Sequence, residues 1–285
     1  MPAPSSPDAV ALFARDAFAG RRVLVTGGGS GIGRATALLF ARSGAHVAIS
    51  GRRDDALLET AALADSPAHP VVVVSADVRE VEQVDALLDR VLSPVEAGGP
   101  GGPGGPGGLG GLDVLVNNAG GQFVAPAESI SMNGFRAVTR LNLDAVWYLT
   151  TQAAARAFIP QSGGVVVSVT MTPHRGIPGM SHSSAARAGV ESMMRTLAVE
   201  WGRHGIRTVA VAPGVVHTEA WERYGLAPAD VSAVIPLGRL QTADEVAAAI
   251  AFVVSPAGAY MTGTTLTVDG GLDVSGPAVL GGGAG

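Results

Sequence analysis

The feature that most constrains the fold of this chain is an alternation of short Val/Ile/Leu runs with longer Ala-rich stretches, from residue 21 to about residue 272. The short runs have the length and β-branched content of strands, and the longer stretches have the length of helices. Parallel neighbours need a crossover helix, so repeated strand–helix units predict a parallel sheet covered on both faces. We expect strands at 22–25, 46–50, 71–75, 113–116, 165–169, 208–212 and 265–268. The predicted fold class is therefore α/β, a single Rossmann-type, doubly wound sheet of about seven strands.

One domain accounts for the length of the chain, since 285 residues suffice to bury a substantial core. We expect it to span 21–272, after a flexible lead-in at 1–20 and before a flexible tail at 273–285. Residues 94–112 are nearly all Gly and Pro, a composition that buries too little apolar surface to offset its ordering entropy. The alternation resumes afterwards, which favours a flexible surface insertion over the alternative, a domain linker.

Composition excludes several classes of function. A net charge of -5 without blocks of like charge predicts no nucleic-acid partner, and no apolar run approaches the roughly 18 residues of a membrane span. The absence of cysteine excludes disulfides, thiolate metal sites and a cysteine nucleophile. It also fits a reducing cytoplasm, the expected location, because the N-terminus lacks the pattern of a secretory signal.

A nucleotide site is predicted by residues 23–34, which read Val-Leu-Val-Thr-Gly-Gly-Gly-Ser-Gly-Ile-Gly-Arg. This is an apolar strand, a glycine turn and the start of a helix. Glycines let the backbone approach a pyrophosphate, and the N-terminus of the helix offers free N–H groups and a positive dipole end to its charge. The expected cofactor contacts here are Gly27, Gly29, Ser30, Gly31, Ile32 and Gly33.

The end of the second strand distinguishes the two nicotinamide cofactors. An acidic residue there would bind the ribose 2′-hydroxyl and repel a 2′-phosphate, but the sequence is Ser50-Gly51-Arg52-Arg53. Arg52 and Arg53 can pair with a phosphate, so we predict NADP(H). The alternative is that one arginine is merely solvated, with Arg53 as the bystander.

Several of these motifs resemble the short-chain dehydrogenase/reductase family. The turn matches its T-G-x-x-x-G-I-G form, Asp77-Val78 resembles its adenine-contacting pair, and residues 117–120 match its N-N-A-G turn. The resemblance covers roughly 21–272 and implies an oxidoreductase that uses a nicotinamide cofactor. It adds a final group of expected cofactor contacts: Asp77, Val78, Asn118, Ala119, Gly120, Arg187, Pro213, Gly214 and Val216.

The same resemblance points to an atypical active site. Where the family usually has Tyr-x-x-x-Lys, this chain has Ser183 and Arg187. A serine does not titrate near neutral pH and an arginine does not deprotonate, so ketone reduction by the usual mechanism is disfavoured. The resemblance makes Asn142 the active-site asparagine, with a local hydrogen bond in its helix as the alternative. It puts Thr170 where a serine usually binds the substrate carbonyl, and Thr170 either donates a hydrogen bond there or is a strand-end residue with no role.

Two further residues are candidates for proton transfer. His182 either donates a proton near neutral pH or only caps and packs at the start of its helix. Tyr224 is either a late proton donor or a wall of the substrate pocket, and Gln122 and Phe123 are expected to line that pocket.

The segments around these candidate residues indicate which reaction to expect. Residues 117–128, 182–190, 212–216 and 222–225 resemble peroxisomal trans-2-enoyl-CoA reductases, and the related 2,4-dienoyl-CoA reductases also lack the tyrosine. The prediction is NADPH-dependent reduction of a C=C bond conjugated to a carbonyl, most simply in an enoyl thioester, because an enolate needs hydrogen-bond donors more than a strong acid. The chain does not end in a peroxisomal address. Two alternatives stay open: a ketone or imine reductase of a biosynthetic pathway, and a catalytically weak NADP(H)-binding regulatory or scaffolding protein.

The segment 183–203 predicts how the protein assembles. Its apolar residues are spread too widely for one buried stripe, which favours burial on two sides and a homo-oligomer, either a tetramer or a dimer. A single deeply buried helix is the alternative.

Overall fold

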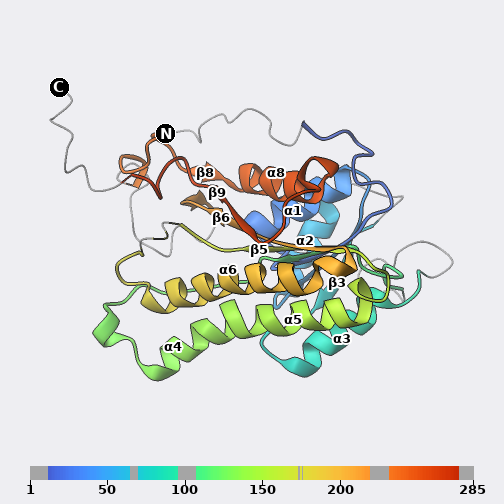
Figure 1. The fold of residues 1–285 in the computed structure, drawn as a ribbon, viewed down its shortest axis with the longest axis horizontal. Helices are drawn as coiled ribbons and strands as arrows, with labels where there is room; N and C mark the ends of the chain where they lie inside the picture. The colour runs from blue at the N-terminus through green and yellow to red at the C-terminus, as the bar shows by residue number, and fades with distance from the viewer. Residues whose placement is uncertain are drawn as a thin grey trace.

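A computed structural model describes residues 12–64, 70–95, 107–172, 174, 176–218 and 231–275. Its centre is a seven-stranded sheet in the order β3-β2-β1-β4-β5-β6-β9, in which every neighbouring pair is parallel (Figure 1). The chain winds outward from β1 in both directions, as a doubly wound fold requires. The strands are β1 (Arg22–Thr26), β2 (His46–Gly51), β3 (Val72–Ser75), β4 (Val114–Asn117), β5 (Gly164–Val169), β6 (Ile206–Pro213) and β9 (Thr264–Val268). Fold class and strand positions are confirmed, with strand ends within two residues of expectation.

Helices cover both faces of the sheet (Figure 1). One face carries α1 (Gly31–Arg42), α2 (Asp54–Leu63) and α8 (Ala243–Val254). The other carries α3 (Val81–Leu92), α5 (Ala145–Ala153) and α6 (Ser181–Trp201). Helix α4 (Met132–Thr139) runs into α5 through a π-helical turn, Arg140–Asp144, and α5 ends in another, Ala154–Phe158. Short 3₁₀ turns lie at Ala127–Ser129, Gly202–His204 and Pro256–Gly258, and β7 (Val216–His217) pairs with β8 (Gln241–Thr242).

Two apolar cores lie on the two faces of the sheet. Val25 and Ile49 belong to the core under α1 and α8, whereas Leu24 and Ala48 belong to the core under α3, α5 and α6. Successive side chains of a strand point to opposite faces, so a sheet covered on both sides needs apolar residues at every position. This explains why the strands read as continuous apolar runs.

Some residues in the segments expected to be flexible are packed against the domain. Phe18, in the predicted lead-in, is buried and packs edge-on against Phe40. Within the Gly/Pro-rich stretch, Leu109 and Leu112 are buried, and the Leu109 N–H donates to the carbonyl of Val91 at the end of α3. Residues 96–106, and the tail from 276, lie outside the described residues.

Helix α6 buries one side of its surface. Ala186, Val190, Met194 and Leu197 lie in the core, whereas Val199 is 85% exposed. A homo-oligomer therefore stays a prediction. Within the described residues, no helix has the length and apolar character to cross a bilayer.

Candidate nucleotide and substrate site

The glycine turn between β1 and α1 has a backbone that larger residues could not adopt. Gly27 and Gly31 have φ of 68° and 51°, in the left-handed region that favours glycine. A Cβ on Gly33 would lie 2.2 Å from the carbonyl oxygen of Gly27 and 2.5 Å from Nδ2 of Asn118. Gly33 thus allows α1 to pack closely on the turn, which Asn118 fixes by donating to the Thr26 carbonyl over 2.9 Å.

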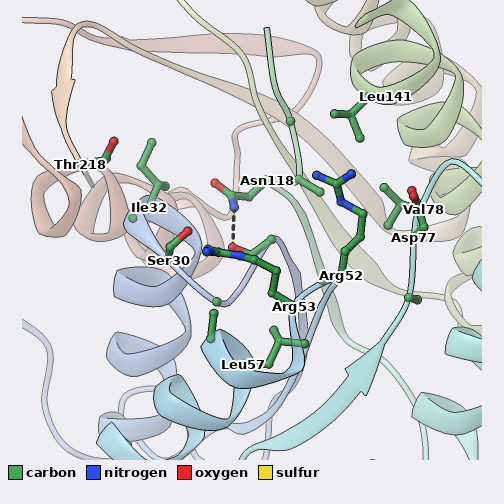
Figure 2. A pocket seen from close by; sticks show the side chains of 18 residues that line it. Ser30, Ile32, Arg52, Arg53, Leu57, Asp77, Val78, Asn118, Leu141 and Thr218 are labelled. Carbon is green, nitrogen blue, oxygen red and sulfur yellow. Dashed lines mark hydrogen bonds between the residues drawn. The ribbon is translucent and has the colours of Figure 1, made fainter. Parts of the chain in front are cut away.

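A cavity of about 290 Å³ opens over this turn (Figure 2). Ser30, the N-cap of α1, makes no side-chain hydrogen bond to the helix, and the first N–H groups of a helix have no partner within it. These groups and the close backbone suit a pyrophosphate, so the residues fit a dinucleotide. The predicted contacts that line the cavity are Gly27, Gly29, Ser30, Gly31, Ile32, Arg52, Arg53, Asp77, Val78, Asn118, Ala119 and Gly120.

The end of this cavity beside β2 is cationic. Arg52 and Arg53 follow β2, line the cavity and are exposed, and in Figure 2 Arg53 extends toward Ser30 while Arg52 extends toward Val78. Asp77, at the end of β3, is paired with Arg79 at 2.5 Å. Hydrogen bonds from Arg79 lower the pKa of Asp77, so the only acidic residue in the lining of this cavity is already neutralised within the described chain.

A second cavity, of about 500 Å³, continues from the first, because Ile32, Asn118, Gly120 and Thr218 line both. Its other walls are largely apolar and come from the segment after β4, the ends of β5 and β6, the start of α6 and Val231. They are Gly121, Gln122, Val124, Val169, Thr170, Met171, Thr172, Ile177, Met180, Arg187, Pro213, Gly214, Val215, Val216 and Val231. The predicted contacts Arg187, Pro213, Gly214 and Val216 therefore lie at this second cavity, and Gly33 alone of the predicted cofactor set lines neither.

Arg187 lies at the junction between the two cavities. Its Nη1 donates to the carbonyls of Val169 and Thr170, over 2.8 and 3.3 Å, so it holds the end of β5. A Cβ on Gly120 would be 3.0 Å from Nη2 of Arg187, which places the guanidinium against the turn that lines both cavities. The guanidinium of Arg187, which stays charged, is thereby fixed beside the turn that lines both cavities.

Ser183 is buried behind the wall of the second cavity. Its hydroxyl donates to Oε1 of Gln122 over 2.8 Å, and Gln122 itself lines the cavity. The serine therefore acts on the cavity through Gln122. The sequence placed Gln122 in the pocket but gave no sign of this pairing.

Asn142 occupies the π-helical turn between α4 and α5. Its Nδ2 donates to the carbonyls of Gly121 and Val138, both over 2.8 Å, and its Oδ1 accepts from the N–H of Gly121. A π-helical turn leaves backbone groups without their usual helical partners, and Asn142 binds one of them. It positions the Gly120–Gly121 turn and lines neither cavity.

Thr170 and His182 make contacts that the sequence did not indicate. The Thr170 hydroxyl donates to Oε1 of Glu191 over 3.0 Å, so its proton is directed to a buried carboxylate. His182 is fully buried, its Nδ1 accepts from the N–H of Ser183, and its ring lies edge-on to Phe123. Tyr224 lies outside the described residues.

Glu191 and His174 are residues of this region that sequence reasoning missed. Glu191 lies one turn after Arg187 on α6, and its other hydrogen-bond partner is Nε2 of His174, at 3.1 Å. The sequence carried only a weak sign of Glu191, which is an acidic residue among the apolar positions of a core helix.

Comparison with known proteins identifies the family. Residues 27–273 match the family described as Enoyl-(Acyl carrier protein) reductase. The chain belongs to the short-chain dehydrogenase/reductase family. This membership makes the chain an oxidoreductase and implies a nicotinamide cofactor, and the cavity over the glycine turn fits such a dinucleotide.

Three relatives illustrate the range of the likeness. The "Probable 2,4-dienoyl-CoA reductase" of Bacillus subtilis is 39% identical over 258 residues, which cover 88% of this chain and 96% of that protein. The glucose 1-dehydrogenase of Gluconobacter oxydans is 36% identical over 92% of this chain and 95% of its own length. The solved structure of the citronellol catabolism dehydrogenase of Pseudomonas aeruginosa is 37% identical, covers 92% of this chain and 98% of that chain, and superposes with a TM-score of 0.78.

Proposed function

We propose that this protein reduces a C=C bond conjugated to the carbonyl of an acyl thioester, a 2-enoyl or 2,4-dienoyl thioester, with NADPH. The observation that carries the proposal is the hydrogen bond between buried Ser183 and Gln122, which lines a largely apolar cavity that continues from the dinucleotide cavity. Neither side chain is a strong acid at neutral pH, whereas an amide can stabilise an enolate oxygen. The similarity to 2,4-dienoyl-CoA reductases supports the same class of substrate.

The preference for NADPH over NADH rests on the end of β2. Gly51 carries no carboxylate to repel a 2′-phosphate, and Arg52 and Arg53 both line the cavity there. An arginine pairs with phosphate oxygens through two parallel hydrogen bonds, which gives strength and orientation. Asp77 does not oppose this preference, because Arg79 neutralises it.

The chemistry divides between the cofactor and the protein. When bound, NADPH would supply the hydride for the β-carbon of an enoyl thioester, which would place the electron pair of the C=C bond on the carbonyl oxygen as an enolate and leave the α-carbon to be protonated. Gln122 accepts a hydrogen bond from Ser183 through Oε1, so its amide nitrogen is the group of this pair that can donate to the enolate oxygen. Arg187 fixes the end of β5 and adds a positive charge nearby, without transferring a proton.

Turnover of purified protein with NADPH tests this proposal directly. Crotonyl-CoA, a longer 2-enoyl-CoA and a 2,4-dienoyl-CoA should each be compared with a panel of simple ketones and with glucose. We expect consumption of NADPH with at least one unsaturated thioester, much faster than with NADH in its place. Reduction of ketones alone would refute the proposal, and tight NADPH binding without turnover would favour a regulatory or scaffolding protein. A cytoplasmic location and a homo-oligomer stay predictions from the sequence.

A further inference from the structure

A hydrogen-bonded chain of side chains runs from the surface of the molecule to the second cavity. Asp273 binds Nδ1 of His174 at 2.6 Å, and Nε2 of His174 binds Oε1 of Glu191 at 3.1 Å. The same Oε1 accepts a hydrogen bond from the hydroxyl of Thr170 at 3.0 Å, and Thr170 lines the second cavity. The chain is thus continuous from an aspartate after β9 to a hydroxyl at the substrate cavity.

Burial increases along this chain toward the cavity. The His174 side chain is 36% exposed and that of Glu191 is 10% exposed, while Thr170 as a residue is 3% exposed. A buried carboxylate is costly unless it is paired, and the hydrogen-bond partners of Glu191 among the described residues are a hydroxyl and an imidazole. His174 can therefore exchange protons with water at one end of the chain, while Thr170 is shielded from water at the other.

Two carboxylates favour the protonated form of His174. The hydrogen bond to Asp273 raises the pKa of His174, burial acts against this, and the charge of Glu191 raises it further. Other charged groups in the neighbourhood are Arg187, one turn before Glu191 on α6, and Asp269, which accepts from the N–H of Asp273. An imidazolium at His174 would neutralise Glu191 and hold a proton available for transfer.

We propose that this chain supplies the proton that completes the reduction, an inference that rests on the proposed function. His174 gives the proton on Nε2 to Oε1 of Glu191, and the protonated carboxyl becomes the donor to Oγ1 of Thr170, so the hydroxyl hydrogen of Thr170 turns from Glu191 toward the cavity. The hydroxyl gives this hydrogen to the α-carbon of the enolate and takes the proton of Glu191 in its place. His174 is left neutral and regains a proton from water, while Asp273 holds its Nδ1–H. One proton enters and one reaches the substrate, so each cycle returns Glu191 and Thr170 to their starting states. Thr170 is the catalytic residue, and His174, Glu191 and Asp273 act through it.

The other polar side chains of the region do not present a proton to this cavity, because they bind other groups, are buried or do not deprotonate. The Ser183 hydroxyl donates to Gln122, and Asn142 binds the backbone of Gly121. His182 is buried against Phe123 and does not line the cavity. Arg187 does not deprotonate in this pH range. Within the described residues, Thr172 also lines this cavity, but its hydroxyl donates to the carbonyl of Pro213, so the relay through Thr170 is the path that we assign.

Glu191→Gln separates proton transfer from structure, because glutamine keeps the shape of the side chain and can accept the hydrogen bond from Thr170 but cannot take up and release a proton. General acid–base groups typically contribute 10²–10⁴-fold, and water can replace part of a relay, so we expect kcat to fall about tenfold to a hundredfold. The Kd for NADPH and the melting temperature should stay close to the wild-type values. Glu200→Gln, an exposed position on the same helix, is the matched control and should leave kcat unchanged.

The pH profile gives a readout that a purely structural role would not change. Wild-type kcat should be constant at low pH and fall as pH rises through the pKa of His174, because the protonated imidazole is the donor. His174→Asn should lose this limb and lower kcat to a similar extent as Glu191→Gln, and added imidazole should restore part of the rate, because the position is open to water. His204→Asn, at a half-buried position in the 3₁₀ turn after α6, is the control.

The outcomes distinguish this inference from the proposed function. Wild-type protein without turnover on any unsaturated thioester would overturn both. Wild-type turnover with unchanged kcat and pH profile in Glu191→Gln and His174→Asn would overturn the relay alone. A lower melting temperature and weaker NADPH binding, without rescue by imidazole, would overturn it in favour of a clamp that only holds the segment after β9.

Discussion

The two cavities of this protein are built in different ways. The dinucleotide cavity is formed chiefly by backbone, from glycines that bring α1 close to β1 and from the N-terminus of that helix. The second cavity is formed by side chains whose polar groups bind one another: Ser183 with Gln122, and Thr170 with Glu191. A site made of backbone depends on residue size and φ, whereas a site made of side chains depends on the partner that each group selects. Substitutions in the dinucleotide cavity should therefore act by steric exclusion of the cofactor. Substitutions in the second cavity should act by removing the hydrogen-bond partner of another side chain.

Gly33→Val should have the largest effect on the dinucleotide cavity. Its Cβ would lie 2.2 Å from the Gly27 carbonyl oxygen, so α1 or the turn has to move, and overpacking of this kind costs about 1–3 kcal/mol or more. If the glycine turn is the part that moves, we expect the affinity for NADPH, measured by calorimetry, to fall at least about a hundredfold. The melting temperature should also fall.

Gly163→Ala provides the matched control for this steric argument. A Cβ at Gly163 meets no atom within 4 Å, and the residue lies just before β5, outside both cavity linings. Affinity and stability should be unchanged. Wild-type affinity in Gly33→Val would show that the turn adapts and that the cavity is not defined by its backbone.

Gly51→Asp should reverse the choice between the two cofactors. The new Cβ would be 3.5 Å from the nearest atom of Leu57, an ordinary contact, so the carboxylate can be added without strain. It would repel a 2′-phosphate and accept hydrogen bonds from a 2′-hydroxyl. We expect the ratio of kcat/KM for NADPH to that for NADH to fall about tenfold to a hundredfold, equivalent to roughly 1.4–2.8 kcal/mol.

Gly51→Ala separates charge from size in this test. It adds the Cβ without the carboxylate and should leave the ratio close to that of the wild type. Arg52→Ala and Arg53→Ala then show which guanidinium holds the phosphate, and whether Arg53 is a bystander. An unchanged ratio in Gly51→Asp would contradict the NADPH preference.

What the sequence could predict follows the same division between backbone and side chains. The Thr26–Gly33 turn was recognisable because glycine is nearly the only residue that fits there, and the seven strands followed from continuous apolar runs. The pairing of Ser183 with Gln122 joins residues 61 positions apart, and that of Thr170 with Glu191 joins residues 21 apart. These contacts depend on side-chain rotamers and on where the neighbouring strands end. Neither can be read from a local sequence motif.

Ser183→Ala tests the substrate cavity with a smaller expected effect. Removal of the hydroxyl leaves Oε1 of Gln122 without its donor, so the amide loses its fixed orientation, and a net hydrogen bond of this kind contributes about 0.5–1.5 kcal/mol. We expect kcat/KM for an unsaturated thioester to fall about tenfold at most, with the affinity for NADPH unchanged. Steady-state kinetics and calorimetry measure the two quantities separately.

The neighbouring serine supplies a matched control. Ser184 lies on the same helix, and its buried Oγ has no hydrogen-bond partner among the described residues, so Ser184→Ala removes a hydroxyl without removing a contact. It should preserve kcat/KM. Equal losses in both variants would mean that the start of α6, and not the Ser183–Gln122 bond, determines the rate.

Asp113→Asn should affect neither cavity and so tests whether the sites are independent of the scaffold. Asp113 lies at the opposite end of the sheet, beside the start of β1, and its carboxylate accepts from Nε and Nη2 of Arg22 over 2.9 and 2.7 Å. Burial alone would raise the pKa of Asp113, but the hydrogen bonds from Arg22 outweigh it and the pKa lies below its ordinary value. The folded protein therefore binds fewer protons at this site than the unfolded chain, and the pair stabilises the fold above the ordinary pKa range of aspartate.

The expected deficit of Asp113→Asn is about 1–3 kcal/mol in the free energy of unfolding at neutral pH, because a partly buried hydrogen-bonded charge loses its partner. That deficit should shrink as pH falls through the ordinary aspartate range toward the lowered folded-state pKa, since protonation removes the same interaction from the wild type. Urea denaturation at several pH values measures it, with Glu59→Gln, at an ion pair whose carboxylate is 60% exposed, as a control expected to change by less than about 1 kcal/mol. NADPH affinity and turnover per folded molecule should be unchanged, and a loss of either would show that the amino ends of β1 and β4 help to shape the cavities at their carboxyl ends.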